Sequence, residues 1–318
     1  MLEGAAERRE RGVPGFLRAS AATLLLFLSG LALPVAGPFV ALLTPQPGLR
    51  FVQRTGRAAG CLLVAVVAAT IGAVAGSAPL AGYVLTFGLI TIALPLALER
   101  GCSIEVTVGL VSALVVTAVV MVGFVVASPA EWFTAIRTGL EQTRDEAVRV
   151  YSQSGLPIEV VEQLEHGSMR IVEVVMRLLP ALLLGGVAIV VLLNLELLRR
   201  RQRRSGAAPV FGDLTRWKSP PELVWVLIAS GYASFLPSGP LQPLAMNAFA
   251  LLAGVYFCQG LVIAQFYMRR WHSPFWVNGL VYLFIVVEWL LATGVALVGL
   301  FDLWADFRRL DPRPAEED

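Results

Sequence analysis

Residues 58–98 read AAGCLLVAVVAATIGAVAGSAPLAGYVLTFGLITIALPLAL and contain no charged side chain. A helix needs about 20 predominantly apolar residues to cross the hydrocarbon core of a bilayer. The residues Gly76-Ser77-Ala78-Pro79 interrupt this stretch near its middle, and such a combination marks a turn between two helices. The stretch therefore predicts two membrane-spanning helices, at about 57–76 and 79–98, joined as a hairpin.

The composition of the whole chain agrees with a membrane location. Of its 318 residues, 57% are hydrophobic and only 15% are charged, and the mean hydropathy is +0.72. Soluble domains are about 45–50% apolar and about 25% charged. Too few polar residues are present to cover a water-soluble fold, so we expect an all-α, polytopic transmembrane helix bundle.

Other apolar blocks predict the remaining membrane segments. Residues 57–130 hold three helices, residues 168–198 hold one, and residues 222–302 hold three more. The last set begins with a second hairpin, broken at Pro237-Ser238-Gly239-Pro240. Together with the block 19–49, they form one membrane domain of eight or nine membrane segments.

The block 19–49 leaves two alternatives open. As one helix it would be about 46 Å long, which is too long for one upright span and too short for two. Pro34 and Pro38 lie in its middle, where each would break the helical hydrogen-bond ladder. The block is either one kinked, tilted helix or a re-entrant pair.

The basic residues orient the bundle. The loop 199–221 carries seven of them, which places it in the cytoplasm by the positive-inside rule. Five belong to one run that we interpret as a topology anchor in contact with anionic lipid headgroups: Arg199, Arg200, Arg201, Arg203 and Arg204. Alternation from this loop places the tail 303–318 outside. It places the N-terminus inside if block 19–49 doubles back, which the four arginines before that block favour.

The segment 131–167 is too polar to span a membrane. It contains three basic and seven acidic residues, and apolar residues recur in it at helical spacing. Gly155-Leu156-Pro157 breaks the pattern in two. We expect an extracytoplasmic amphipathic helical insertion, which is either a lid or shelf on the bundle or merely a long connector.

Glu288 is the clearest candidate for chemistry. It lies near the middle of the last apolar block, in Val286-Val287-Glu288-Trp289. An ionised carboxylate in the bilayer is costly unless it is paired or protonated. Glu288 is therefore either a proton or ligand site, or a neutral carboxyl that holds helices together.

Asn247, Gln259 and Gln265 form a second candidate set in an otherwise apolar helix. Asn247 and Gln265 are 18 residues apart, which is five helical turns, so they share one face. Such residues either contact a ligand or join helices by hydrogen bonds.

No motif in the chain points to an enzyme. The sequence has no GxxxxGK[ST], HExxH or GxSxG, and its three cysteines and two histidines have no metal-site spacing. We therefore assign no catalytic residues, cofactor or metal. The basic run has no interleaved aromatic residues, so we expect no nucleic-acid binding.

Three segments in the last third of the chain resemble a known family. They are Phe211-Gly212-Asp213-Leu214 with Trp217 and Pro220, Asn247–Tyr256 with Gln259 and Gly260, and Gly299–Trp304 with Asp306, Phe307 and Arg308. They resemble the YybS-like family of bacterial integral membrane proteins, a domain of unknown function. That family is remotely similar to the substrate-binding subunits of energy-coupling-factor transporters, which have no ATPase of their own.

Two functions follow as expectations. The first is a transport-type or small-ligand-binding subunit, with a cavity lined by Glu288 and the Asn247 face and with a separate ATPase or coupling module as partner. The alternative is a non-catalytic scaffold or assembly factor that joins other membrane proteins in cell-envelope or division processes. Lys218 is the only lysine among 25 basic residues, a bias that hints at a bacterium and hence its cytoplasmic (inner) membrane.

Overall fold

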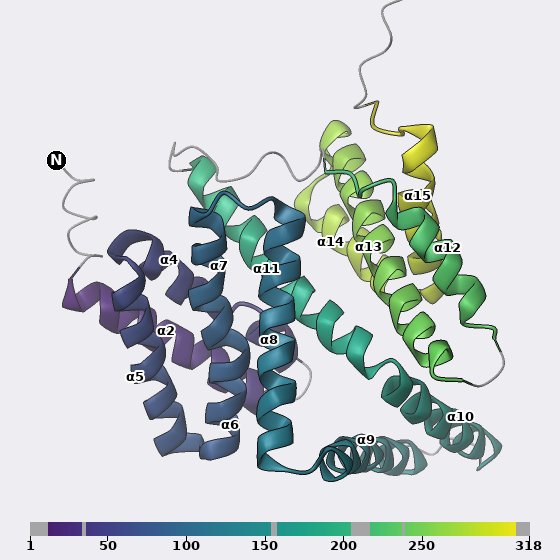
Figure 1. Ribbon diagram of the computed structural model, residues 1–318, viewed down its shortest axis with the longest axis horizontal. Coiled ribbons are helices and arrows are strands. Elements are labelled where there is room, and N and C mark those ends of the chain that lie inside the picture. The colour runs from purple at the N-terminus through teal and green to yellow at the C-terminus, as the bar shows by residue number, and fades with distance from the viewer. Residues whose placement is uncertain (1–11, 34–35, 154–157, 205–216, 237–238, 310–318) are drawn as a thin grey trace, which may run out of the picture. The chain divides into compact units, whose positions relative to one another are not determined.

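The computed structural model describes residues 12–33, 36–153, 158–204, 217–236 and 239–309, and its regular elements over these ranges are all helices (Figure 1). The chain divides into two compact units. Unit 1 comprises Met1–Ile136 and Leu183–Phe211, and unit 2 comprises Arg137–Leu182 and Gly212–Asp318.

Within the described residues, six helical segments are long and apolar enough to cross a membrane. They are α2 (Val13–Ala32), α5 (Arg57–Ala75), the segment Ser77–Glu99, α8 (Ile104–Val126), α11 (Leu179–Arg204) and α13 (Leu241–Arg270). A seventh arises if α14 (Phe275–Val287) and α15 (Trp289–Ala305) together form one bent span. The helix α12 (Leu223–Ala233) is apolar but shorter. The predicted all-helical membrane architecture is confirmed, whereas eight or nine segments remain a prediction.

The first predicted hairpin is present. Helix α5 ends at Ala75, and Gly76 adopts φ +94°, a left-handed conformation that glycine allows at low cost. The returning segment consists of α6 (Ser77–Gly82), one π-helical stretch η1 (Tyr83–Gly88) and α7 (Leu89–Glu99). An exposed ion pair of 3.4 Å between Arg57 and Glu99 places the two ends of the hairpin at the same level.

The block 19–49 folds back on itself. Helix α2 is followed by α3 (Gly37–Ala41) and α4 (Pro45–Thr55), and both shorter helices pack against α2. The rings of Phe16, near the start of α2, and Phe51, near the end of α4, are 5.8 Å apart. The fold-back puts Arg18 and Arg54 near the same end of the α2–α4 pair, and the choice between one crossing and a re-entrant pair remains a prediction.

The polar segment after α8 forms two helices, α9 (Pro129–Ser152) and α10 (Ile158–Arg177), and the break expected at 155–157 lies outside the described residues. A capping box starts α9: the Ser128 N–H donates to Glu131, and the Glu131 N–H donates to the Ser128 hydroxyl. The hydrogen bonds from Ser128 to the Glu131 carboxylate hold its pKa below the usual range. The role of these helices as an amphipathic lid and their extracytoplasmic location remain predictions.

The helix expected over 168–198 is divided in the structure. Residues up to Arg177 continue α10, and α11 starts at Leu179. Pro180 explains the break, because proline lacks an N–H and fits only the first turn of a helix.

The second predicted hairpin is also present, between α12 and α13 in unit 2. Their shared core contains Val224, Leu227, Leu252 and Tyr256. Helix α15 packs on α13 at two glycines: a Cβ on Gly260 would collide with the carbonyl of Val295, and a Cβ on Gly299 would collide with the carbonyl of Tyr256. The two backbones are therefore in direct contact.

The last apolar block is not the continuous span that the sequence indicated. Glu288 has extended backbone angles (φ −92°, ψ 105°) and separates α14 from α15, which are bent by 98°. Three β-branched residues, Ile285-Val286-Val287, run into Glu288, and such residues have reduced helix propensity.

Candidate functional site

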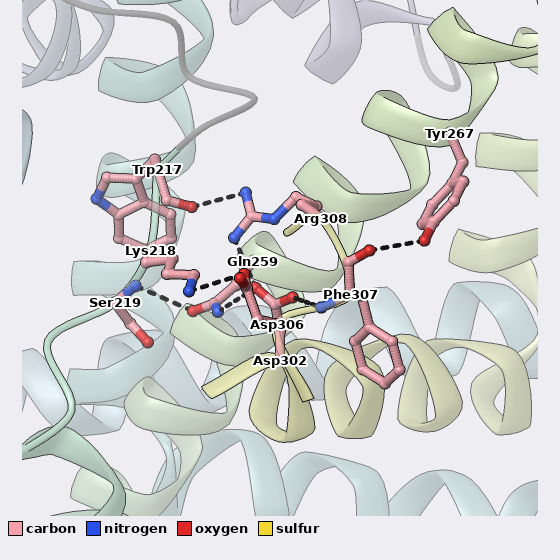
Figure 2. A network of polar contacts seen from close by, with 9 residues as sticks. All are labelled: Trp217, Lys218, Ser219, Gln259, Tyr267, Asp302, Asp306, Phe307 and Arg308. Atoms are coloured by element: carbon pink, nitrogen blue, oxygen red, sulfur yellow. Dashed lines mark hydrogen bonds and ion pairs between the residues drawn. The ribbon is translucent and has the colours of Figure 1, made fainter. Parts of the chain in front are cut away.

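A buried ion pair lies at the end of α15 in unit 2. Nη2 of Arg308 donates to Oδ2 of Asp302 at 2.6 Å, and both side chains are 0% exposed (Figure 2). The two residues are six positions apart, so a continuous helix would not bring them together. Asp306 makes the pairing possible, because its left-handed conformation (φ 38°, ψ 56°) ends α15 and turns the chain back.

Three further donors and acceptors complete this network. Nε2 of Gln259 donates to Oδ2 of Asp302 at 3.2 Å, and the N–H of Phe307 donates to Oδ1 at 3.0 Å. Nη1 of Arg308 donates to the carbonyl of Trp217 at 2.9 Å. Both oxygens of the buried carboxylate are thereby occupied, as a buried charge requires.

The network joins three segments that are far apart in the sequence. Oε1 of Gln259 accepts the N–H of Ser219 at 3.0 Å, and Nζ of Lys218 lies 2.9 Å from Oδ1 of Asp306 (Figure 2). The segment 217–219, helix α13 and the segment 302–308 are thus fixed to one another. We call this set of contacts the Asp302 clamp. It consists of Trp217, Lys218, Ser219, Gln259, Asp302, Asp306, Phe307 and Arg308.

The Asp302 clamp shows where the C-terminal tail starts relative to the basic loop. Trp217 belongs to the end of the basic loop, and Arg308 belongs to the start of the tail, yet they share a hydrogen bond. The two segments therefore lie on the same side of unit 2. Alternation of spans predicted opposite sides of the membrane for the loop and the tail, and that prediction counted the last apolar block as one straight crossing, whereas α14 and α15 are bent by 98°.

The α14–α15 pair, bent by 98°, has the form of either a broken span or a re-entrant loop. Oη of Tyr267, near the end of α13, donates to the carbonyl of Phe307 at 2.8 Å. The chain leaves α13 at Arg270 and enters α14 at Phe275, so both ends of the pair lie near the end of α13. Glu288, at the bend, is the tip.

Glu288 is exposed at this tip, and its neighbours are exposed as well. Val287, Trp289 and Leu290 are 68%, 75% and 65% accessible. The residue occupies the N-cap position of α15, whose first-turn N–H groups point toward it. The Glu288 carboxylate therefore lies among exposed apolar side chains.

Asn247 lies at the break between α10 and α11, away from the clamp. Its Oδ1 accepts the N–H of Ala181 at 2.9 Å, and its Nδ2 donates to the carbonyls of Arg177 and Pro243 at 2.9 and 2.8 Å. The amide thus replaces hydrogen bonds that the break removes from the helix. Gln265 is half-buried on α13. The predicted residues Gln259 and Asn247 therefore have different hydrogen-bond partners, and a cavity lined by both remains a prediction.

The arginine run divides between two faces of α11. Arg199 is 3% exposed and donates to Glu196 at 2.8 Å, and Arg200 donates to the same carboxylate at 2.7 Å. Arg201, Arg203 and Arg204 are exposed. Headgroup contact remains a prediction for the exposed members and does not suit the buried side chain of Arg199.

Sequence reasoning missed two buried amides in unit 1. Nδ2 of Asn194 donates to the carbonyl of Leu42 at 2.9 Å, and Nε2 of Gln46 donates to the carbonyl of Asn194 at 2.7 Å. Asn194 is the only Asn, Gln or charged residue in 179–195, which was the available signal. Asp302 and Arg308 entered the sequence analysis only as part of the segment that resembles a known family. Their ion pair could not be predicted, because it depends on the turn at Asp306.

The described residues contain no group of three or more His, Cys, Asp or Glu side chains that could hold a metal ion. Comparison with known protein families shows which family the sequence matches. A family model described as "Predicted membrane protein (DUF2232)" matches residues 21–303. No curated protein and no solved structure matches the chain.

Proposed function

The chain belongs to this family of predicted membrane proteins (DUF2232), whose function is unknown, and we propose that it is a transport-type or small-ligand-binding membrane subunit. One observation carries the proposal: an exposed carboxylate, Glu288, stands at the tip of a broken helix pair in an apolar segment. Broken helices with an ionisable group at the break are the usual way in which transporters build a site inside the bilayer.

The chemistry at the tip fits a proton or a small polar ligand. The carboxylate of Glu288 accepts a proton or a cationic group. The unpaired N–H groups in the first turn of α15 donate to an acceptor atom of the ligand, and the positive end of the helix dipole favours negative charge there. The carboxylate attracts positive charge, whereas the N-terminus of α15 attracts negative charge. Which ligand binds at the tip therefore depends on whether Glu288 is charged.

The energy for transport comes from outside this chain in the proposal. The sequence holds no P-loop, so a separate ATPase with a coupling subunit, or an ion gradient, drives the conformational change. The proposed location is the cytoplasmic (inner) membrane of a bacterium, and no enzymatic activity is assigned.

Substitution at the tip tests the proposal. Glu288→Gln keeps the size and removes the charge, and Glu288→Leu also removes the hydrogen-bonding capacity. Both variants should express, insert and unfold like the wild type, yet fail to complement a deletion strain. Glu222→Gln, which removes an exposed carboxylate at the start of α12, is the matched control and should complement. Wild-type behaviour of both Glu288 variants would refute the site.

A scaffold in envelope or division assemblies is the second candidate, and one observation favours it. Asn247 and Gln259 bond mainly to backbone groups, which is the behaviour of residues that fix helices in place. Affinity purification from native membranes separates the two functions. An ATPase and its coupling subunit should copurify with a transport subunit, whereas cell-wall synthesis proteins should copurify with a scaffold.

A further inference from the structure

A small basic pocket in unit 1 lies outside the site described above. It is a cavity of about 100 Å³ between α4 and α11, lined by Arg50, Gln53, Arg54, Leu198, Arg201 and Gln202. This volume is well below the roughly 300 Å³ at which pockets for drug-sized ligands begin. Three of the six lining side chains are positively charged and none is negative. Its size and charge suit one small anionic group.

The packing of the two helices explains why the pocket forms where it does. The hydrogen bonds of Gln46 and Asn194 tie α4 to α11 at one level. Arg50 and Leu198 lie one helical turn further along, at i+4 from these amides. Beyond that level most of the lining side chains are long arginines and glutamines, and the cavity lies among them.

Neither Arg50 nor Arg201 forms an ion pair with a carboxylate in the part of the chain that the structure describes. Glu196 bonds to Arg199 and Arg200, whereas Arg201 projects about 140° away from Glu196 around the helix. The Nε–H of Arg50 is buried and has no acceptor in the part of the chain that the structure describes. An anion between Arg50 and Arg201 would provide that acceptor.

Repulsion between the guanidinium groups of Arg50 and Arg201 also favours a bound anion. Burial, together with the positive charge of Arg201, lowers the pKa of Arg50. A bound anion would remove this penalty, because it attracts both groups at once.

The position of the pocket identifies the anion. Leu198 and Arg201 lie in the last two turns of α11, a candidate span, and basic residues at the end of a span meet lipid headgroups. Guanidinium groups match the geometry of phosphate oxygens. We propose that the pocket binds the phosphate of an anionic phospholipid headgroup.

Binding is measured on the full chain, purified in a neutral detergent. Short-chain phosphatidylglycerol is titrated in one arm and inorganic phosphate in the other, and thermal unfolding reports binding. Native mass spectrometry then counts lipids retained from vesicles of phosphatidylcholine with phosphatidylglycerol. The wild type should be stabilised by the lipid and much less by inorganic phosphate.

Three variants with the same change of charge locate the site. Arg50→Gln and Arg201→Gln should each weaken lipid binding about tenfold or more, since each removes a charged hydrogen bond. Arg204→Gln, in the same run but outside the pocket, is the control and should bind almost as the wild type does. Arg201 is exposed, so Arg201→Gln remains informative if Arg50→Gln fails to fold.

Two results would overturn the proposal. If Arg204→Gln lost as much affinity as Arg201→Gln, the attraction would be diffuse and no built site would exist. If inorganic phosphate stabilised the chain as well as the lipid did, the pocket would serve a soluble anion.

Discussion

Arg308 and Asp302 form a 2.6 Å ion pair in which neither side chain is exposed. Taking two charges out of water is expensive, and the remaining hydrogen bonds of the Asp302 clamp offset that cost. The pair fixes the end of α15 to α13 and to the segment 217–219, so it determines where the C-terminal tail starts.

Removing one partner of this pair should be severely destabilising. Asp302→Asn leaves the guanidinium of Arg308 buried and uncompensated, and such changes cost about 3–5 kcal/mol. We expect a marked drop in the thermal midpoint in detergent. The double variant Asp302→Leu/Arg308→Met should lose less stability than the two single changes added together. Additive losses would show that the two side chains do not interact.

The contact between α13 and α15 should not tolerate a methyl group. Gly299→Ala places a Cβ against the carbonyl of Tyr256, so the helices must separate, and overpacking of this kind costs about 1–3 kcal/mol. Gly254→Ala on α13 is the matched control, because a Cβ there meets nothing within 4 Å. The control should be neutral or slightly stabilising in the same unfolding assay. Equal effects of both changes would contradict direct backbone contact.

Asn247 should contribute to the stability of the fold and not to ligand binding. Asn247→Ala leaves the N–H of the buried Ala181 without its acceptor, which costs about 1–3 kcal/mol for a buried group; the exposed carbonyl of Arg177 also loses its donor. We expect a lower unfolding midpoint, with any loss of activity following the loss of folded protein. Full stability combined with lost function would instead make Asn247 a ligand-binding residue.

The C-terminal tail should lie on the same side of the membrane as the basic loop. In a variant without Cys61, Cys102 and Cys258, single cysteines are introduced at Ala315 and at Ala207. A membrane-impermeant maleimide should label both or neither in intact cells, and both after lysis. Opposite labelling would mean that the α14–α15 pair crosses the bilayer.

The two apolar hairpins could be predicted from the sequence: one turns at Gly76, and the other joins α12 to α13, with Pro237 and Ser238 of its turn outside the described residues. Their turns are marked by glycine and proline, which act locally. The α10–α11 break also has a local cause in Pro180, although the apolar pattern obscured it. The kink at Glu288 could not be predicted from composition, because a single carboxyl between apolar residues is compatible with a straight or a broken helix.

The apolar blocks of the sequence by themselves determined that this chain is a helical membrane protein. In a bilayer the backbone must satisfy its own hydrogen bonds, so a run without charge such as 58–98 has to become helical. Only the tertiary structure decided which polar residues are paired. Arg308 reaches Asp302 because Asp306 turns the chain back, and Gln259 reaches Asp302 because Gly260 and Gly299 let two helices touch. These contacts join residues from different segments of the chain, so the spacing of residues along a single helix does not predict them.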